Sequence, residues 1–480
     1  MKRKGMAFSA LIVMMHMALA GCGADAQPVP SDSVHDGGMM TPQIAAEGAD
    51  PWIIKEHGIY YYIHIVDDSI VLQSSTNLTD IDGAEPVTIF SNHAELEQLW
   101  APELHFLDEH WYVYFSACTH ADDIHRTYVL ESSDSHLMSS TWTERPLVGM
   151  DDKFAIDATV VANKTGRYLV WSGWQGNENI AQNLYISKMI SPLEVEREKI
   201  LISKPQLSWE KVGTPLVNEG PVAIVHGKTV NIAYSASGSW TDSYCVGLLT
   251  APVDAELDTP EAWIKKAEPI MQMANDVWGP GHNSFVESPD GKETIMVYHA
   301  AKFSGAGWDR SVRIQPVEFN SDGSLTRVIP TPSYQLMRVP SGEPRRTRLL
   351  ATDTSSISKS LTLVDDKRAL GGKSVDGLRS YDDAVSWTFS VGAPMRYSII
   401  LYASTVVATP GSPALVRYSV DGEASARDFE LSRSDFYQPL VLRVPLGEGK
   451  HTIMVSANAA HSPVRINRVE IMPITVPDVD

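Results

Sequence analysis

The chain has 480 residues, with 59 acidic against 39 basic side chains and a formal net charge of −20. A chain of this length exceeds one ordinary hydrophobic core and predicts two domains. The strong negative charge repels phosphate backbones and anionic polymers, which excludes nucleic acid as a natural partner and leaves neutral polysaccharide as a candidate.

The N-terminus has the pattern of a secretion signal. A Lys-Arg-Lys cluster at residues 2–4 precedes an apolar run over residues 6–19 that is too short to span a bilayer. The next residues, LAGC, end at Cys22 and resemble a bacterial lipobox. They predict a signal peptide over residues 1–21 and a lipid anchor on Cys22, with ordinary cleavage and secretion as the alternative. Either outcome places the protein at the bacterial cell envelope or outside the cell.

Neither the segment after the signal nor the two remaining cysteines predicts a folded element or a cross-link. Residues 22–45 are rich in Pro, Ser, Gly and Asp, and we expect them to form a flexible tether. Cys118 and Cys245 lie far apart in strand-like contexts, and their spacing matches neither a disulfide framework nor a zinc site. Both are therefore expected to be buried free thiols.

Five segments share one pattern, in which a polar residue is followed by a short apolar strand, a tight turn and an alternating strand. They start at Asp50 (DPWIIKEHGIYYYI), Pro102 (PELHFLDEHWYVYFSA), Asp157 (DATVVANKTGRYLVWSG), Glu219 (EGPVAIVHGKTVNIAYSA) and Asn283 (NSFVESPDGKETIMVYHA). Repeats at this spacing have room for about four strands each. The sequence predicts an all-β fold that begins with a five-bladed β-propeller over residues 46–345.

Three carboxylates occupy closely equivalent positions in these repeats. The innermost strand of every blade lines the axis of a propeller, so Asp50, Asp157 and Glu219 should face one cavity. Glu219 lies in the apolar run LVNEGPVAI, where burial and the neighbouring carboxylates are expected to raise its pKa. Glu103 has almost the same register in the second repeat, and we interpret it as structural.

Carboxyl groups that flank a glycosidic bond are sufficient for its hydrolysis. One donates a proton to the leaving oxygen, and the other activates water or attacks the sugar. The repeats contain no Ser-His-Asp grouping, phosphate-binding glycine loop or HExxH motif. Each carboxylate also has a structural alternative, since Asp50 could start a turn, Asp157 could cap a bend and Glu219 could bind backbone amides.

Several motifs together resemble those of glycoside hydrolase family 43. They are DPWII at Asp50, LWAPELHF at Leu99, IDATVV around Asp157, NEGPV at Asn218 and GPGHNSF at Gly279. WSGW, YSASGSWTDSYCVGLLTA and WDRSVRIQPVEF are similar to the branch of that family that contains α-L-arabinofuranosidases. The motifs follow the family's order along nearly the whole predicted propeller.

The resemblance implies an inverting mechanism with assigned roles. Asp50 would be the general base, Glu219 the general acid, and Asp157 the residue that adjusts the pKa and orientation of the acid. Many family members have proline after the middle aspartate, where this chain has Ala158. That difference concerns the backbone geometry rather than the chemistry.

Further residues are candidates for binding substrate or an ion. Trp100 and Trp174 could stack on a sugar ring, although tryptophans in a propeller more often pack between blades. Arg313 resembles an arginine that contacts substrate, with a surface cation as the alternative. His282 would help to hold a structural calcium ion near the axis, with a hydrogen-bonded core histidine as the alternative. The chemistry itself requires no cofactor.

A second domain begins after the propeller. Alternating strands separated by longer loops predict a jelly-roll-like β-sandwich over residues 360–480. Its motifs resemble carbohydrate-binding modules, for which Trp387 and Tyr437 are candidate binding aromatics, and a purely structural domain is the alternative.

The sequence favours an enzyme that releases terminal α-L-arabinofuranose from arabinan, arabino-oligosaccharides or arabinoxylan, and acts as a monomer. A β-xylosidase or endo-arabinanase is the alternative within the family, because the same three carboxylates serve those activities. A surface lipoprotein that binds glycans without hydrolysing them is the alternative from another class.

Overall fold

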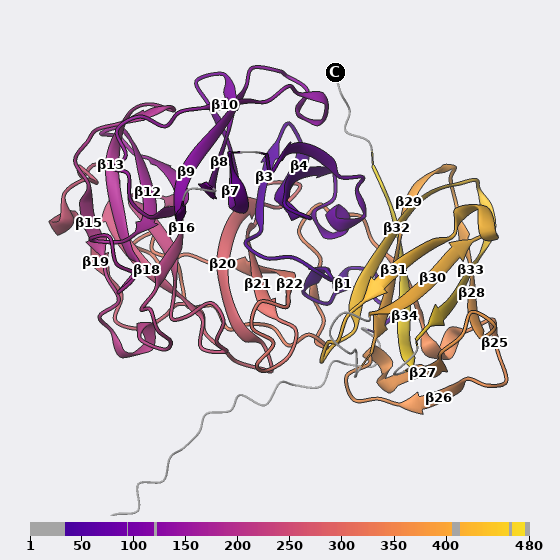
Figure 1. The fold of residues 1–480 in the computed structure, drawn as a ribbon. Helices are drawn as coiled ribbons and strands as arrows, with labels where there is room; N and C mark the ends of the chain where they lie inside the picture. Colours follow the sequence, from indigo (N-terminus) through magenta and orange to yellow (C-terminus); the bar gives the residue numbers. More distant parts are fainter. Residues whose placement is uncertain (1–33, 94, 120–121, 406–412, 460–462, 476–480) are drawn as a thin grey trace, which may run out of the picture.

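The structure is a computed structural model, and it describes residues 34–93, 95–119, 122–405, 413–459 and 463–475. Two units lie side by side in Figure 1, a ring of blades coloured indigo to salmon and a sandwich coloured orange to yellow. The sheets of both units consist of antiparallel strands, which confirms the predicted all-β fold. In the described part of the chain, no helix has the length and apolar character needed to cross a lipid bilayer.

Five sheets form the propeller. The innermost strands are β3 (Trp52–Glu56), β7 (Glu97–Leu107), β11 (Ala155–Ala162), β16 (Asn218–His226) and β20 (Trp278–Glu287), and they contact one another in a closed ring. In blade 1 the strands that follow outward are β4 (Ile59–Val66), β5 (Ser69–Ser75) and β6 (Val87–Ser91), and in blade 2 they are β8 (His110–Thr119), β9 (Asp122–Ser132) and β10 (Thr143–Arg145). Blade 3 adds β12 (Arg167–Gly173), β13 (Asn183–Ser191), β14 (Glu194–Val195) and β15 (Ile200–Ser203). Blade 4 adds β17 (Thr229–Ala236), β18 (Cys245–Pro252) and β19 (Ile264–Lys265), and blade 5 adds β21 (Thr294–Ala301) and β22 (Arg310–Val317).

The two cysteines in the propeller, Cys118 and Cys245, are free and buried, as predicted.

The outermost strand of blade 5 comes from the N-terminal end of the described chain. Strand β2 (Gln43–Ala45) pairs with β22, and β1 (Met39–Met40) pairs with β23 (Met337–Arg338). The prediction of a flexible tether over residues 22–45 is therefore wrong for residues 39–45, where Met40, Ile44 and Ala45 are buried in a core shared by blades 1 and 5. The predicted signal peptide and Cys22 lie outside the described residues.

Two sheets pack face to face in the sandwich. One contains β24 (Thr347–Leu350), β26 (Thr362–Asp365), β27 (Lys373–Leu378), β29 (Met395–Ser404), β32 (Gln438–Leu446) and β34 (Val464–Pro473), and the other contains β25 (Ser356–Ile357), β28 (Ala384–Val391), β30 (Ala414–Val420), β31 (Arg427–Leu431) and β33 (Gly449–Asn458). Because β24 pairs with β34 and β25 with β28, the sandwich starts before the predicted residue 360.

The two candidate binding aromatics of the sandwich are core residues. Trp387 is fully buried and its Nε1–H donates to the carbonyl oxygen of Leu350 at 2.8 Å. Tyr437 is buried and its hydroxyl donates to Asp366 Oδ2 at 2.6 Å. Neither ring is free to stack on a sugar, so carbohydrate binding by the sandwich stays a prediction without its proposed aromatics.

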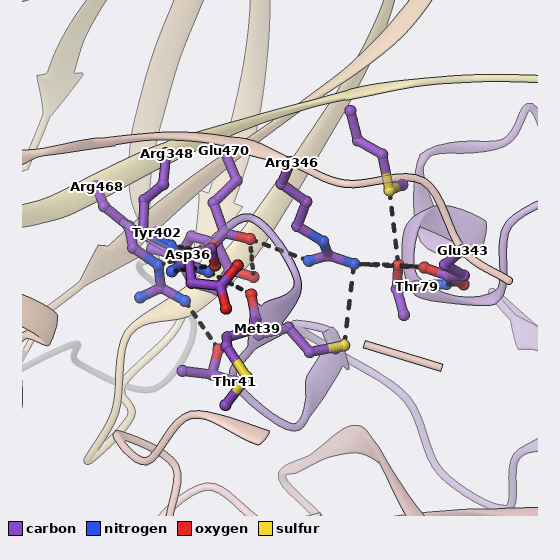
Figure 2. A network of polar contacts seen from close by, with 12 residues as sticks. Asp36, Met39, Thr41, Thr79, Glu343, Arg346, Arg348, Tyr402, Arg468 and Glu470 are labelled. Carbon is purple, nitrogen blue, oxygen red and sulfur yellow. Dashed lines mark hydrogen bonds and ion pairs between the residues drawn. The ribbon is translucent and has the colours of Figure 1, made fainter. Parts of the chain in front are cut away.

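A buried cluster of charges joins the two units (Figure 2). Glu470 of β34 lies 3.0 Å from Arg346 Nη1, 2.8 Å from Arg348 Nε and 2.8 Å from Arg468 Nε, and all four side chains are buried. Burial alone would raise the pKa of Glu470, but the three guanidinium groups hold it well below its ordinary value. The carboxylate is therefore charged and fully paired inside the protein.

The same arginines hold the N-terminal segment and the propeller. Arg468 Nη2 donates to Thr41 Oγ1 at 2.8 Å, and Arg348 Nη1 donates to the carbonyl oxygen of Val34 at 2.7 Å. In Figure 2 Arg346 lies between Glu470 and Thr79, and its Nη2 donates to the hydroxyl of Thr79 in the 3-10 helix η2 (Leu78–Gly83). Three parts of the chain therefore meet at one cluster.

Glu470→Gln should destabilise the protein strongly. The change leaves Arg348 and Arg468 without their buried countercharge and leaves Arg346 with Glu343 alone, at 3.5 Å. Breaking a buried ion pair costs about 3–5 kcal/mol of unfolding free energy. Urea unfolding followed by tryptophan fluorescence and circular dichroism measures the loss. Glu423→Gln is the control, because Glu423 pairs with Arg417 on the surface and should contribute less than about 1 kcal/mol. Equal losses in the two variants would contradict the assignment.

Candidate active site

One backbone feature recurs at the start of every innermost strand. Asp50 (φ 47), Ala101 (φ 42), Asp157 (φ 56), Gly220 (φ 53) and His282 (φ 44) all have left-handed backbone conformations. In blades 2 to 5 the pairing register also shifts at this point, so the inner strand carries a β-bulge there. Bulges re-aim side chains and occur near active sites, and left-handed residues other than glycine are strained.

The three predicted carboxylates line one cavity of about 490 Å³. Asp157 and His282 occupy the bulge positions of their blades, and Asp50 has the corresponding left-handed position just before β3. Glu219 lies one residue before the bulge residue of its own blade. Gly220 occupies that position, and a Cβ atom there would lie 3.1 Å from the His282 ring. The other lining residues are Ala49, Trp100, Ala101, Ile156, Asn179, Gln182, Pro215, Ser239, Trp240, Trp308 and Arg310.

Glu219 is buried and has the properties of a general acid. Its Oε1 accepts a hydrogen bond of 2.8 Å from the Tyr244 hydroxyl. Burial and the negative charge of Asp157 raise the pKa of Glu219 to about 7, against opposing effects of His282 and Tyr244. A carboxyl group with this pKa holds its proton up to neutral pH, where it can donate it to a leaving group.

Asp157 lies beside Glu219 and holds the backbone of Gly220, the residue that follows Glu219. Its Oδ2 accepts a hydrogen bond of 2.9 Å from the N–H of Gly220, and its own N–H donates to Ser116 Oγ at 3.2 Å. Burial raises the pKa of Asp157, as does the charge of Asp50, while His282 lowers it. This carboxyl group is thus placed to act on Glu219 through both charge and geometry.

Asp50 differs from the other two carboxylates because it faces positive charge. Its Oδ1 lies 3.1 Å from His282 Nδ1 and 3.5 Å from Arg310 Nη1, and its N–H donates to His299 Nδ1 at 3.0 Å. Burial alone would raise the pKa of Asp50, but His282 and His299 together outweigh this effect and the pKa lies well below its ordinary value. Asp50 is therefore ionised when Glu219 is protonated.

His282 is the positively charged side chain that interacts with these carboxylates. Burial alone would lower its pKa, but the charges of Asp50, Asp157 and Glu219 raise it to about 10. Calcium takes six to eight oxygen ligands, and within the described residues no group of three or more His, Cys, Asp or Glu side chains is arranged to hold a metal ion. Protein side chains of these types alone therefore do not form the predicted calcium site in the described part of the chain, where His282 pairs with Asp50. A structural calcium ion near the axis stays a prediction.

The three predicted substrate-binding residues, Trp100, Trp174 and Arg313, differ from one another in whether they line the cavity. Trp100 lines the cavity with 40% of its surface exposed, stacked on His125 with a centroid distance of 3.4 Å. Trp174 stacks on Phe154 at 4.4 Å and does not line the cavity. Trp100 is thus available for a sugar. A sugar contact by Trp174 stays a prediction, and Trp174 is not among the residues that line the cavity.

The prediction that Arg313 contacts substrate is wrong. Its guanidinium group is buried within blade 5, where Nη1 donates to Ser333 Oγ at 2.9 Å and Nη2 to the carbonyl oxygen of Thr331 at 2.6 Å. Arg310, three residues earlier on β22, reaches the cavity instead. Side chains alternate along a strand, so residues three apart face opposite sides of the sheet.

Sequence reasoning missed several residues of the site besides Arg310. Tyr244 and Trp308 lie within motifs that matched the family, but no spacing in the sequence singled them out. Trp308 stands at the cavity with 68% of its surface exposed, and Trp240 with 37%. Glu103, read as structural, is buried 3.0 Å from His105 Nε2, and does not line the cavity.

Asp157→Asn should move the basic limb of the pH–rate profile to lower pH by about one unit. The negative charge of Asp157 raises the pKa of Glu219, so removing that charge lowers this pKa, and the acid loses its proton at lower pH. Asparagine keeps an oxygen that can accept from Gly220. The measurement is kcat against pH, with circular dichroism at each pH as the control for folding, and an unchanged basic limb would rule out this role.

An ionised carboxylate and a protonated carboxyl group in one cavity are the two groups that glycoside hydrolysis requires. The chain belongs to glycosyl hydrolases family 43, whose sequence model matches residues 39–325. This match confirms the resemblance seen in the motifs and extends it to β1 and β2, which precede the first repeat.

Known proteins similar to this chain include arabinofuranosidases. An extracellular exo-α-(1→5)-L-arabinofuranosidase of Streptomyces avermitilis is 37% identical over 340 residues, which are 67% of this chain and 69% of that protein. The crystal structure of an α-L-arabinofuranosidase from Lactobacillus brevis has 30% identity and a TM-score of 0.57, over 61% of this chain and 97% of that one. An exo-β-1,3-galactanase from Phanerochaete chrysosporium, at 13% identity, shares the fold over 90% of this chain and 100% of its own, with a TM-score of 0.51.

Proposed function

We propose that the protein is an inverting α-L-arabinofuranosidase that releases terminal α-L-arabinofuranose from arabinan, arabino-oligosaccharides or arabinoxylan. The observation that carries the proposal is the opposite behaviour of two carboxyl groups in one cavity. The pKa of Glu219 is raised to about 7, whereas that of Asp50 lies well below its ordinary value. The arabinofuranosidases among the similar proteins support the choice of sugar.

In this mechanism each carboxyl group has one task. Glu219 donates its proton to the glycosidic oxygen as the bond to the anomeric carbon breaks. Asp50 accepts a proton from a water molecule that attacks the same carbon from the opposite face, so the anomeric configuration inverts. Asp157 keeps the pKa of Glu219 near neutrality, and His282 and Arg310 hold Asp50 ionised. These side chains complete the reaction without a cofactor.

The proposal also covers substrate binding, the mode of action and the location of the enzyme. Trp100, Trp240 and Trp308 expose ring surface at the cavity, and such rings stack on the apolar faces of sugars. Exo action is favoured by the name of the Streptomyces relative. One chain supplies all three carboxylates, which is consistent with a monomer. The extracellular relatives support secretion, and the LAGC sequence supports a lipid anchor on Cys22 at the cell envelope.

Proton NMR of the purified protein with linear α-1,5-linked arabino-oligosaccharides tests the proposal. We expect β-arabinofuranose as the first product, because inversion at an α-linked sugar yields the β anomer before mutarotation. First appearance of the α anomer would contradict inversion. If no arabinose appears, the same assay with xylo-oligosaccharides and arabinoxylan separates a xylosidase from a protein that binds glycans without cleaving them.

A further inference from the structure

Lys302 is buried where the propeller meets the sandwich, directly after β21. Its side chain is 0% exposed, and its ammonium group contacts Glu47 Oε1, Asp309 Oδ1 at 2.9 Å and Ser432 Oγ at 2.6 Å. A buried ammonium group is costly unless it is paired and hydrogen-bonded. Three segments that are distant in the sequence are therefore held together by one charge.

Two of these segments carry the active site. Glu47 lies three residues before Asp50, and the intervening Ala49 lines the cavity. Asp309 directly precedes Arg310, which lines the cavity and lies 3.5 Å from Asp50. Lys302 thus joins the segment of the base to the segment of the arginine that contacts the base.

The third segment belongs to the sandwich. Ser432 accepts from Lys302 and donates to Glu47 Oε1 at 2.9 Å. The N–H of Asp435 donates to the carbonyl oxygen of Lys302 at 3.0 Å, and the Arg433 guanidinium lies 4.0 Å from the centroid of the Phe303 ring. The sandwich therefore binds the start of the loop formed by residues 302–309.

The far side of this loop is fixed to blade 4. Ser304 Oγ donates to Asp242 Oδ2 at 2.6 Å, and Trp308 Nε1 donates to Ser239 Oγ at 3.2 Å. Trp308 lines the cavity, as does Trp240 beside Ser239. The loop thus connects the sandwich on one side with the tryptophans of the cavity on the other.

We propose that Lys302 is a positioning residue through which the sandwich, by Ser432, holds Asp50 and Arg310 in their working geometry. The inference rests on the proposed function, since it assigns the sandwich a role in the same reaction. A catalytic base must lie within hydrogen-bonding reach of its water, and small displacements lower the rate strongly. The sandwich is thus part of the catalytic unit, whether or not it binds glycan.

The test compares hydroxyl deletions at two sites where a sandwich serine donates to a propeller carboxylate. Ser432→Ala removes the bonds to Lys302 and Glu47, and Ser398→Ala removes the bond to Asp80, which does not line the cavity. For Ser432→Ala we expect kcat/KM on arabino-oligosaccharides to fall roughly three- to tenfold, mainly through kcat. Ser432→Thr keeps the hydroxyl and should restore most of the rate, and Ser398→Ala should match the parent.

Hydrogen–deuterium exchange of the intact chain gives a readout that needs no substrate. Ser432→Ala should speed exchange over residues 46–50 and 302–310, and Ser398→Ala should not. Lys302→Met should lower kcat by roughly 10- to 100-fold where it folds. Parental kcat and parental exchange in Ser432→Ala would overturn the proposal. A parent without arabinosidase activity would instead count against the proposed function, and exchange would still decide the role of Lys302.

Discussion

Glu219→Gln should lower kcat/KM on arabino-oligosaccharides by roughly 10²- to 10⁴-fold, the usual contribution of a general acid. The amide has the size of the carboxyl group and still accepts the Tyr244 hydrogen bond, but it has no acidic proton to donate. A sugar hydroxyl is a poor leaving group and needs that proton, whereas 4-nitrophenolate leaves unaided. Hydrolysis of 4-nitrophenyl α-L-arabinofuranoside should therefore fall much less than hydrolysis of the oligosaccharides.

Glu103→Gln is the matched control for this variant. Glu103 is also a buried glutamate near the axis, and burial, helped by the charge of Asp157, raises its pKa well above the ordinary value. The amide resembles a carboxyl group that is already protonated, so this variant should keep most of the parent activity. If Glu219→Gln cleaved oligosaccharides as fast as Glu103→Gln, another group would have to be the acid.

Asp50→Asn should also lower kcat/KM by roughly 10²- to 10⁴-fold, but equally on both kinds of substrate. Activation of the attacking water is needed whatever the leaving group, so a good leaving group cannot replace the base. The ratio between the two substrates is then the measurement that separates base from acid. Binding should persist in both variants, and isothermal titration with an arabino-oligosaccharide shows whether it does.

Asp108→Asn provides the control for the base variant. Asp108 has a left-handed backbone (φ 49) like Asp50 (φ 47), and pairs with Arg167 at 2.8 Å. It lies in an exposed hairpin turn, so the same substitution should leave the kinetics unchanged. A loss in Asp50→Asn confined to oligosaccharides would contradict its role as base.

The repeat pattern was sufficient to predict the propeller and the meeting of Asp50, Asp157 and Glu219. Equivalent positions in a propeller converge whatever the blades contain, so a correct register places these residues without atomic detail. The left-handed backbone at Asp50 and Asp157 and the bulge at Asp157 were not predictable, because nothing in single-sequence periodicity marks them. They nonetheless determine which way these side chains point.

Other parts of the site depend on detail that the pattern does not contain. Arg310 and Arg313 both lie on β22, and the choice between them required knowing which face of the sheet is turned to the cavity. Strand β2 has only three residues, too few for an alternating pattern, so its composition indicates a tether. Lys302 has no signal of its own, because its three partners are brought together only by the packing of the two units.

The closure of blade 5 also imposes an order on folding. Gln43 of β2 pairs with Arg313 of β22, so the ring cannot close until the whole propeller has been synthesised. Arg468, near the end of the described chain, then binds Thr41 just before β2. Contacts between such distant residues form slowly, because a long loop of chain must be ordered before they stabilise anything. The earliest-made strand of the propeller is thus fixed among the last, and the native state requires both ends of the described chain.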